Sequence, residues 1–277
     1  MTMKMMKNMQ HLIIHNRSCD IYYWLRQGTG NQWALFFHGA GVDHRMFDQQ
    51  IEDFDPAFNL IAWDARGHGA SKLEKGTVFH FLDMVSDCLK IYERHHIEKA
   101  VLIGQSMGGN LAQEIACSNP EKVEKLVLID CSRNTGKLSQ FEKAAVKLSR
   151  LMFCLYPWKS IIRQSADACG NKECVKSYVR ECFKGIGKKM FMNVFIELTT
   201  CLHEDTQFRF KQPVLLFCGA DDRLGNIRKI AEPWAADDSA IQLHIIKNAG
   251  HNSNQDQPET VNHYIEQFLN AAYDVQV

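Results

Sequence analysis

The chain has 277 residues, of which 45% are hydrophobic and 23% charged, and it is long enough to bury a core without disulfides or metal ions. Its 32 basic side chains balance 32 acidic ones, which argues against the basic surface typical of nucleic-acid-binding proteins. Its apolar runs are shorter than the ~18 residues that cross a membrane. We therefore expect a globular protein that has no membrane span and binds no nucleic acid.

The start of the chain and its cysteines indicate a cytoplasmic protein. The opening MTMKMMKNMQ holds two lysines, but no apolar stretch of the kind that a secretory signal needs follows it. Ten cysteines are present, and the spacings typical of zinc sites are absent. We interpret the cysteines as reduced, mostly buried thiols.

Strand-like and helix-like segments alternate along most of the chain. Two short runs, 11–15 and 20–26, predict an antiparallel pair at the start. Near-continuously apolar runs then predict buried parallel strands at 33–39, 58–64, 99–105, 123–130, 212–219 and 241–247. Amphipathic segments predict helices at 78–95, 107–118, 225–236 and 259–272. The alternation predicts an α/β fold with a mostly parallel central sheet and helices on both faces.

The alternation stops between Arg133 and Lys211. This stretch is helical in composition, has one proline and contains no convincing strand. We interpret residues 133–210 as a helical insertion between two strands of the sheet. The predicted core domain then consists of residues 1–132 and 211–277.

The motif GQSMG at residues 104–108 lies where a predicted strand gives way to a predicted helix. Ser106 therefore falls at the carboxyl end of a strand, where sheets of this kind gather their chemistry. A serine there needs a sharp, strained turn to expose its hydroxyl, and the flanking glycines leave room for that turn. The helix that follows directs backbone N–H groups toward the same point. The pattern predicts a nucleophile elbow with Ser106 as the nucleophile.

A serine hydroxyl is a weak nucleophile at neutral pH, so it needs a base, and the base needs an orienting acid. On this kind of fold the order along the chain is Ser, then Asp or Glu, then His. Asp222 follows the predicted strand 212–219, and His251 follows the last predicted strand. All of these side chains therefore fall at the carboxyl ends of parallel strands, where they could converge.

At this point the chain resembles the α/β-hydrolase fold superfamily, on its small serine esterase and lipase-like branch. The motifs that carry the resemblance are HGAG (38–41), DARGHGAS (64–71), GQSMGG (104–109), GADD (219–222) and NAGH (248–251). They extend over nearly the whole chain except the insertion. The resemblance implies that residues 133–210 form a helical cap over the active site.

The resemblance also implies roles for the candidate triad. Ser106 would be the nucleophile, His251 the general base and then acid, and Asp222 the residue that orients the imidazole. The family spacing Gly-x-x-Asp selects Asp222 over the adjacent Asp221. Asp130, at the end of the strand after the elbow, is the reserve candidate for the acid.

The oxyanion hole would combine the backbone N–H groups of Ala40 and Met107. His38 would brace the loop that carries Ala40, and His68 would shape a turn. Phe153 and Trp158 are candidates for the substrate pocket, although packing between cap helices explains these side chains equally well.

The favoured function is a serine hydrolase that cleaves a small carboxylic ester, thioester or lactone through an acyl-enzyme. Ser106 at the elbow argues against dehalogenases and epoxide hydrolases, which use Asp there. Enzymes of the cofactor-free haloperoxidase type, carbon–carbon bond hydrolases, a lyase and a weakly catalytic receptor for a small ligand stay open, because fold does not fix function. Without a dinucleotide, Walker, HExxH or EF-hand motif, we expect no cofactor and no metal. The sequence leaves the oligomeric state open.

Overall fold

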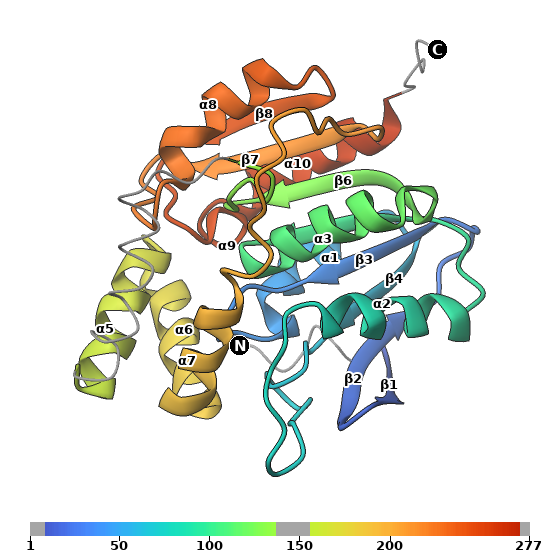
Figure 1. Ribbon diagram of the computed structural model, residues 1–277. Coiled ribbons are helices and arrows are strands. Elements are labelled where there is room, and N and C mark those ends of the chain that lie inside the picture. Colours follow the sequence, from blue (N-terminus) through green and yellow to red (C-terminus); the bar gives the residue numbers. More distant parts are fainter. Residues whose placement is uncertain (1–8, 137–155, 272–277) are drawn as a thin grey trace.

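The computed structural model describes residues 9–136 and 156–271, and its centre is an eight-stranded sheet (Figure 1). The strands lie in the order β1-β2-β4-β3-β5-β6-β7-β8. They are β1 (Gln10–Asn16), β2 (Cys19–Arg26), β3 (Trp33–Phe37), β4 (Asn59–Trp63), β5 (Ala100–Gln105), β6 (Val123–Ile129), β7 (Val214–Gly219) and β8 (Ile241–Ile246). β2 pairs antiparallel with both β1 and β4, whereas β3, β4, β5, β6, β7 and β8 are all parallel to one another. The predicted mostly parallel sheet is confirmed.

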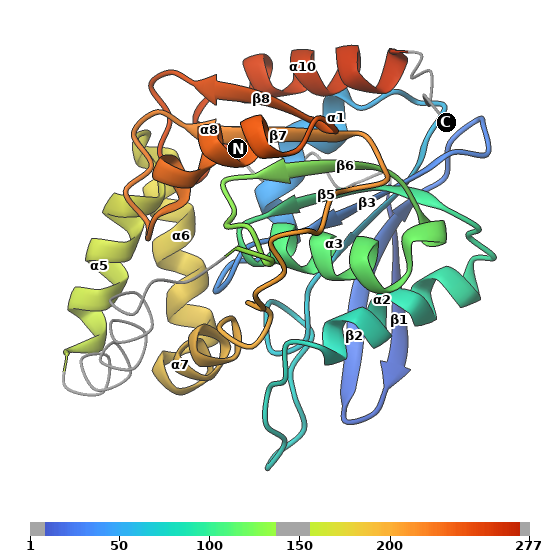
Figure 2. The same ribbon diagram turned by 45° about the horizontal axis from the view of Figure 1, so that its top comes forward.

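Helices cover both faces of this sheet (Figures 1 and 2). In the core they are α1 (Asp48–Asp53), α2 (Asp83–Arg94), α3 (Met107–Ser118), α8 (Ile227–Asp237), α9 (Ser253–Asp256) and α10 (Pro258–Asn270). Successive side chains of a strand point to opposite faces. Leu35 and Phe37 therefore join the apolar core under α2, α3 and α8, while Ala34 and Phe36 join the core under α1 and α10. This double burial explains why the strand sequences are almost continuously apolar.

The start of α2 differs from the prediction. A helix was expected from residue 78, but α2 begins at Asp83. Phe79 and Phe81 are both fully buried. Two positions that differ by two residues cannot share one face of a helix. The backbone that carries both buried rings is therefore not helical, and the helix begins after them. The N–H of Phe81 donates to the carboxylate of Glu197 instead of continuing a helix.

Between β6 and β7 the described residues form helices and no strand. These helices are α5 (Trp158–Cys169), α6 (Glu173–Ile186) and α7 (Lys188–Glu197). They lie together on the side toward which β6 and β7 point (Figures 1 and 2). The helical character predicted for the segment agrees with the described part, and the division into a core and an inserted domain stays a prediction. In the described part of the chain, no helix is long and apolar enough to cross a membrane.

Candidate active site

Ser106 occupies a tight turn between β5 and α3. Its φ of 50° and ψ of −114° are a strained combination for a residue with a side chain. The neighbouring glycines make the turn possible, because a Cβ on Gly104 would lie 2.2 Å from the carbonyl oxygen of Gly108. A Cβ on Gly108 would lie 1.9 Å from the carbonyl oxygen of Phe37. Strand and helix therefore approach each other as the predicted elbow requires.

Asp222 and His251 form a buried pair. Asp222 follows β7, His251 follows β8, and Nδ1 of His251 lies 2.9 Å from Oδ2 of Asp222. The side chain of Asp222 is fully buried and that of His251 is 7% exposed. Burial disfavours the charged imidazole, but the Asp222 carboxylate outweighs it and raises the pKa of His251 above its usual value. Because an ionised carboxylate can only accept, Nδ1 of His251 carries the hydrogen that it donates to Asp222.

Other contacts bring the turn at Ser106 and the loop of His251 together. The side-chain amide of Gln105 donates from Nε2 to the carbonyl oxygen of His251 over 2.7 Å. Gln105 precedes Ser106, so this bond ties the elbow to the loop of His251. On the other side, a Cβ on Gly39 would lie 3.4 Å from Cβ of Ser106. The residues after Gly39 and Ser106 are Ala40 and Met107, so both candidate oxyanion donors lie at this junction.

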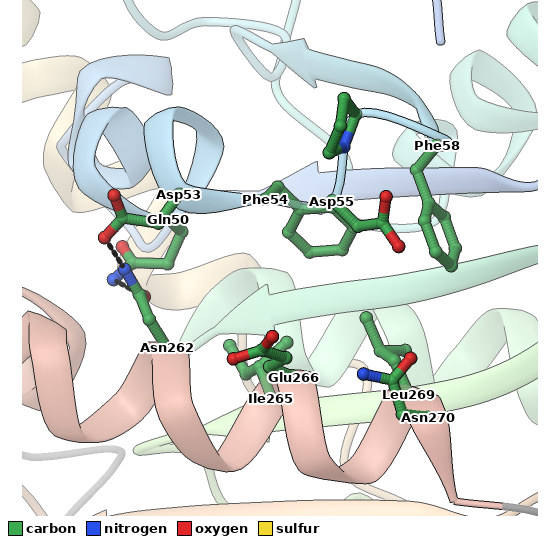
Figure 3. A pocket seen from close by; sticks show the side chains of 11 residues that line it. Gln50, Asp53, Phe54, Asp55, Phe58, Asn262, Ile265, Glu266, Leu269 and Asn270 are labelled. Carbon is green, nitrogen blue, oxygen red and sulfur yellow. Dashed lines mark hydrogen bonds between the residues drawn. The ribbon is translucent and has the colours of Figure 1, made fainter. Parts of the chain in front are cut away.

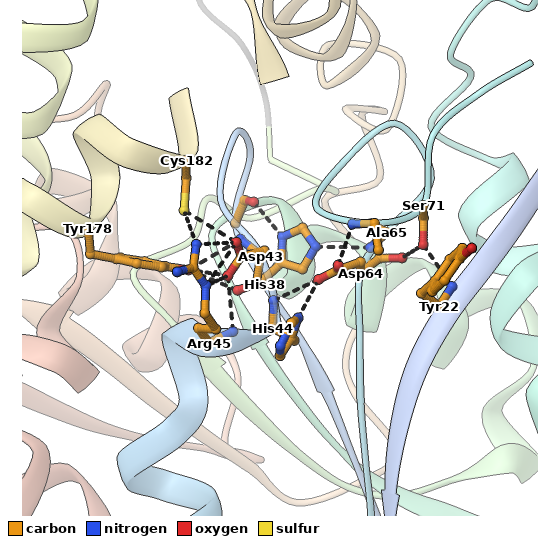
Figure 4. A network of polar contacts seen from close by, with 12 residues as sticks. Tyr22, His38, Asp43, His44, Arg45, Asp64, Ala65, Ser71, Tyr178 and Cys182 are labelled. Carbon is orange, nitrogen blue, oxygen red and sulfur yellow. Dashed lines mark hydrogen bonds and ion pairs between the residues drawn. The ribbon is translucent and has the colours of Figure 1, made fainter. Parts of the chain in front are cut away.

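His38 is buried in the loop that carries Ala40. Its Nδ1 lies 2.7 Å from the carbonyl oxygen of Gly39, and its Nε2 accepts from the N–H of Ala65 over 2.9 Å (Figure 4). Burial lowers the pKa of His38 and, to about 3, that of His68. A neutral His38 with both ring nitrogens engaged fits a brace for the loop and is ill suited to proton transfer.

The same loop is fastened further along by two aspartates (Figure 4). Asp64 accepts from the backbone N–H of His44 and also pairs with its ring. Burial opposes the charge of Asp64, but the contacts with His44 lower its pKa to about 2. Asp43 binds the guanidinium of Arg45, and its backbone carbonyl accepts from the hydroxyl of Tyr178 in α6 over 2.9 Å. The loop is therefore held from the sheet side and from α6.

Asp130, the reserve acid, is engaged elsewhere. It is fully buried, and its carboxylate oxygens accept from the N–H groups of Gly219 and Ser253 over 2.7 and 2.8 Å. Burial raises the pKa of Asp130 to about 7. The adjacent alternative, Asp221, accepts from the side-chain amide of Asn171 at the surface. Of the candidate acids, it is Asp222 that lies against the ring nitrogen of His251.

Asp130 also belongs to a group of potential metal ligands. One carboxylate oxygen each of Asp130 and Asp222 and the sulfur of Cys218 lie within 4.8 Å of one another. The oxygens of Asp130 accept two backbone N–H groups, and those of Asp222 accept from His251 and from the N–H of Leu224. Protein donors therefore already use these carboxylates, and hydrogen bonds within the protein explain the group.

The two candidate pocket residues differ in what can be said of them. Phe153 lies outside the described residues. Trp158 is the first residue of α5, and its ring lies parallel to that of Phe183 at 6.3 Å and tilted against that of Phe191 at 5.5 Å. Trp158, Phe183 and Phe191 form an aromatic cluster, and a Cβ on Gly41 would lie 2.6 Å from the Phe183 ring. The cluster thus covers the residue next to Ala40.

Two of the hollows at the surface of the described part differ in their relation to the candidate site. One, of about 300 Å³, lies between the loop 41–45, the turn 69–72 and the second half of α6. The other, of about 240 Å³, lies between α1 and α10, and its lining contains none of the candidate site residues (Figure 3). Only the first therefore borders the candidate site, through Gly41.

An elbow after β5, followed by an aspartate after β7 and a histidine after β8 on a mostly parallel sheet, defines the α/β-hydrolase fold. The chain belongs to the family described as serine aminopeptidase, S33, whose model matches residues 31–258. It is a hydrolase of this fold, as the sequence motifs predicted.

Individual relatives agree with this assignment. The chain is 24% identical to the uncharacterized hydrolase YugF of Bacillus subtilis, over 90% of this chain and 94% of that one. It is 23% identical to 3-oxoadipate enol-lactonase 2 of Acinetobacter baylyi, over 87% and 90% of the two chains. Among solved structures, an esterase from Thermogutta terrifontis has the same fold with a TM-score of 0.78 at 21% identity, covering 94% of this chain and 98% of that one.

The sequence interpretation assigned no role to Gln105 or Asp256. Gln105 reads as the variable position of the elbow motif, and its contact with His251 is visible only in the structure. Asp256 stands five residues after His251 and just before Pro258, where an acidic side chain looks like an ordinary helix start. Two of its partners, Asn171 and Lys172, lie far away in sequence, and all of its partners are backbone N–H groups, so no local pattern marks it.

Proposed function

We propose that the chain is a serine hydrolase that cleaves a small carboxylic ester, thioester or lactone through an acyl-enzyme. The observation that carries the proposal is the buried Asp222–His251 pair, 2.9 Å apart, on a loop tied to the strained elbow of Ser106. Each group comes from the carboxyl end of a different parallel strand, which supports a common site.

In this mechanism the hydroxyl of Ser106 attacks the carbonyl carbon while its proton passes to Nε2 of His251. Asp222 holds the tautomer and stabilises the imidazolium. The N–H groups of Ala40 and Met107 would stabilise the oxyanion, and a donor of this kind contributes about 3 kcal/mol. The imidazolium then protonates the leaving alcohol or thiol, and water releases the acid by the same steps in reverse roles.

The relatives support ester-like substrates. One relative is named as an enol-lactonase and one neighbouring structure as an esterase, and both names describe cleavage of an acyl–oxygen bond. A lactone is an internal ester, so one acyl-transfer mechanism serves both. The family description names a serine aminopeptidase, and an aminoacyl amide therefore belongs among the substrates to be tested.

We further propose that α5, α6 and α7 act as the cap over this site, within an inserted segment 133–210. Support comes from the aromatic cluster, which packs against Gly41 beside the candidate oxyanion donor Ala40. An apolar cover favours a small substrate with an apolar acyl or alcohol group. Trp158, together with Phe153, would then line the pocket.

The test is intact-mass analysis after treatment with a fluorophosphonate, which labels an activated serine. We expect a single adduct on the wild-type chain and none on Ser106→Ala. A panel of short esters, thioesters, lactones and an aminoacyl amide then ranks the substrates. An adduct with no turnover in the panel would favour a receptor or another reaction class, and no adduct at all would reject the serine hydrolase mechanism.

A further inference from the structure

Helix α6 begins without a capping side chain of its own. Its N-cap residue is Lys172, whose side chain has no acceptor and makes no capping hydrogen bond. The backbone N–H groups at a helix start need acceptors. For the N-cap residue the acceptor is Asp256, whose carboxylate binds the N–H of Lys172 over 2.9 Å and also that of the preceding Asn171 over 2.8 Å. Asp256 lies 84 residues beyond Lys172 in the chain.

The same carboxylate holds the loop of the catalytic base. Asp256 is fully buried, and it also accepts from the N–H of Gly250 over 2.8 Å. On the other side of His251, the N–H of Asn252 donates to the carbonyl oxygen of Cys169 over 2.7 Å. Both neighbours of His251 are thus bonded to the turn between α5 and α6, one of them through Asp256.

The middle of α6 and its second half contact the loop of the oxyanion hole. The hydroxyl of Tyr178 donates to the carbonyl oxygen of Asp43 and lies 3.2 Å from its backbone nitrogen (Figure 4). Further along the helix, Phe183 packs against Gly41. A single helix therefore touches the loop of His251 at its start and the loop of Ala40 from its middle onward.

We propose that Asp256 is a positioning residue that couples α6 to His251. A helix start favours a negative charge, and three backbone donors satisfy this buried carboxylate. The bonds of Asp256 to the start of α6 and to Gly250 would then fix the orientation of the adjacent His251 ring relative to the loop of Ser106. The inference rests on the proposed function, in which His251 is the base. It assigns the inserted helices a part in aligning the catalytic groups in addition to covering them.

The first test is Asp256→Asn, which keeps the size of the side chain but replaces one acceptor oxygen by a donor that faces backbone N–H groups. We expect kcat to fall about 10- to 100-fold, the scale of a misplacement of about 1 Å. KM should change much less, and labelling of Ser106 by the fluorophosphonate should slow in parallel with kcat. A merely structural residue would lower Tm while leaving the labelling rate of the folded fraction unchanged.

The second test removes one donor from the α6 side. The φ of Lys172 is −76°, which suits proline, so Lys172→Pro deletes the N–H that donates to Asp256 without moving the carboxylate. Lys172→Ala keeps that N–H and is the matched control, because the Lys172 side chain is exposed. We expect Lys172→Pro to lower kcat about threefold to tenfold relative to Lys172→Ala, as a weaker form of the same misplacement.

Hydrogen exchange of the segment 249–253 gives a readout that needs no substrate. Exchange should be faster in Asp256→Asn and in Lys172→Pro than in Lys172→Ala. Unchanged exchange in both variants would overturn the coupling, whether or not the chain hydrolyses esters. A wild-type chain that takes no phosphonate would reject the proposed function separately. If Asp256→Asn slows the reaction but Lys172→Pro behaves like Lys172→Ala, the coupling through α6 is rejected.

Discussion

The loops at the carboxyl ends of the strands and the helices α5, α6 and α7 obey different constraints. In the loops, single atoms decide which residue fits, as at Gly108, where any side chain would meet the carbonyl oxygen of Phe37. In the helices, apolar rings such as Trp158 and Phe191 pack at 5 to 6 Å and leave several residue types acceptable. Sequence motifs therefore record the chemistry of the loops, while the helices, which would select the substrate, leave no motif.

The largest effect should come from the elbow. Ser106→Ala removes the nucleophile, and loss of a triad serine costs about 10⁶-fold in kcat by analogy with measured triads. Alanine fits the site of a serine, so the fold should remain. Hydrolysis of p-nitrophenyl acetate by the purified variant checks the expected loss of activity. The control is Ser118→Ala, which changes an exposed serine at the end of α3, the helix that follows the elbow. If Ser106→Ala hydrolyses the ester at the wild-type rate, Ser106 is not the nucleophile and the elbow has no part in the reaction.

The second effect separates the candidate acids. Asp222→Asn leaves the imidazole poorly oriented and should lower kcat about 10²- to 10⁴-fold. The carboxylate of Asp222 raises the pKa of His251, so its loss should also move the acidic limb of kcat/KM to lower pH. Asp130→Asn should lower kcat much less, because Asp130 binds backbone N–H groups. A rate profile over pH for both variants decides, and the reverse ranking would move the acid to Asp130.

A smaller effect concerns stability. Burial raises the pKa of Asp130 to about 7, and the carboxylate of Asp222 raises the pKa of His251. At these two groups the folded state therefore holds protons that the unfolded state has released, and their contribution to stability falls as pH rises through the folded pKa values. Burial lowers the pKa values of His38 and His68, and their contribution to stability rises with pH up to the usual histidine pKa, so a comparison of two chains is needed to isolate Asp130. We expect the Tm of the wild type, relative to that of Asp130→Asn, to fall between pH 5 and pH 8. A difference in Tm that rises with pH over this range would contradict the raised pKa of Asp130.

The positions of the strands and of the elbow could be predicted from the sequence because their physical causes are local. A buried parallel strand must be apolar on both faces, and an elbow needs glycine at two fixed positions. The start of α2 could not be predicted, since Phe79 and Phe81 are both buried there and the N–H of Phe81 binds Glu197 in α7, far away in sequence. Helical spacing alone gave no warning of that contact.

The candidate site divides in the same way. Ser106, Asp222 and His251 follow from motif order, and the pairing of His251 with Asp222 agrees with that expectation. Asp256 acts through backbone groups near residues 171 and 250, far apart in sequence, so its position had to be seen in three dimensions. Backbone donors carry no residue identity, which explains why one sequence cannot reveal their partners.

The smallest effect tests the helices themselves. Trp158→Ala removes a ring that lies parallel to that of Phe183 and tilted against that of Phe191. Each aromatic contact contributes about 0.5 to 1.5 kcal/mol to stability, so Tm should fall by several degrees. If Trp158 also lines the pocket, the rate of hydrolysis of long-chain acyl esters relative to short-chain ones should rise about threefold to tenfold. Removal of the indole ring makes room in the pocket for additional methylene groups. We expect both changes. Tyr156→Ala, at a residue that is 45% exposed on the same segment, should produce neither.

The measurement that decides is the acyl-chain ranking in Trp158→Ala and, separately, in Phe153→Ala. A variant that loses thermal stability but keeps the wild-type ranking carries a packing residue, and the pocket is then lined by others. Because an apolar cover admits only dissolved substrates of modest size, the wild-type chain should hydrolyse dissolved short-chain esters faster than emulsified long-chain triglyceride. The opposite preference would place the reacting ester at an open surface, and the helices α5, α6 and α7 would then have no part in choosing the substrate.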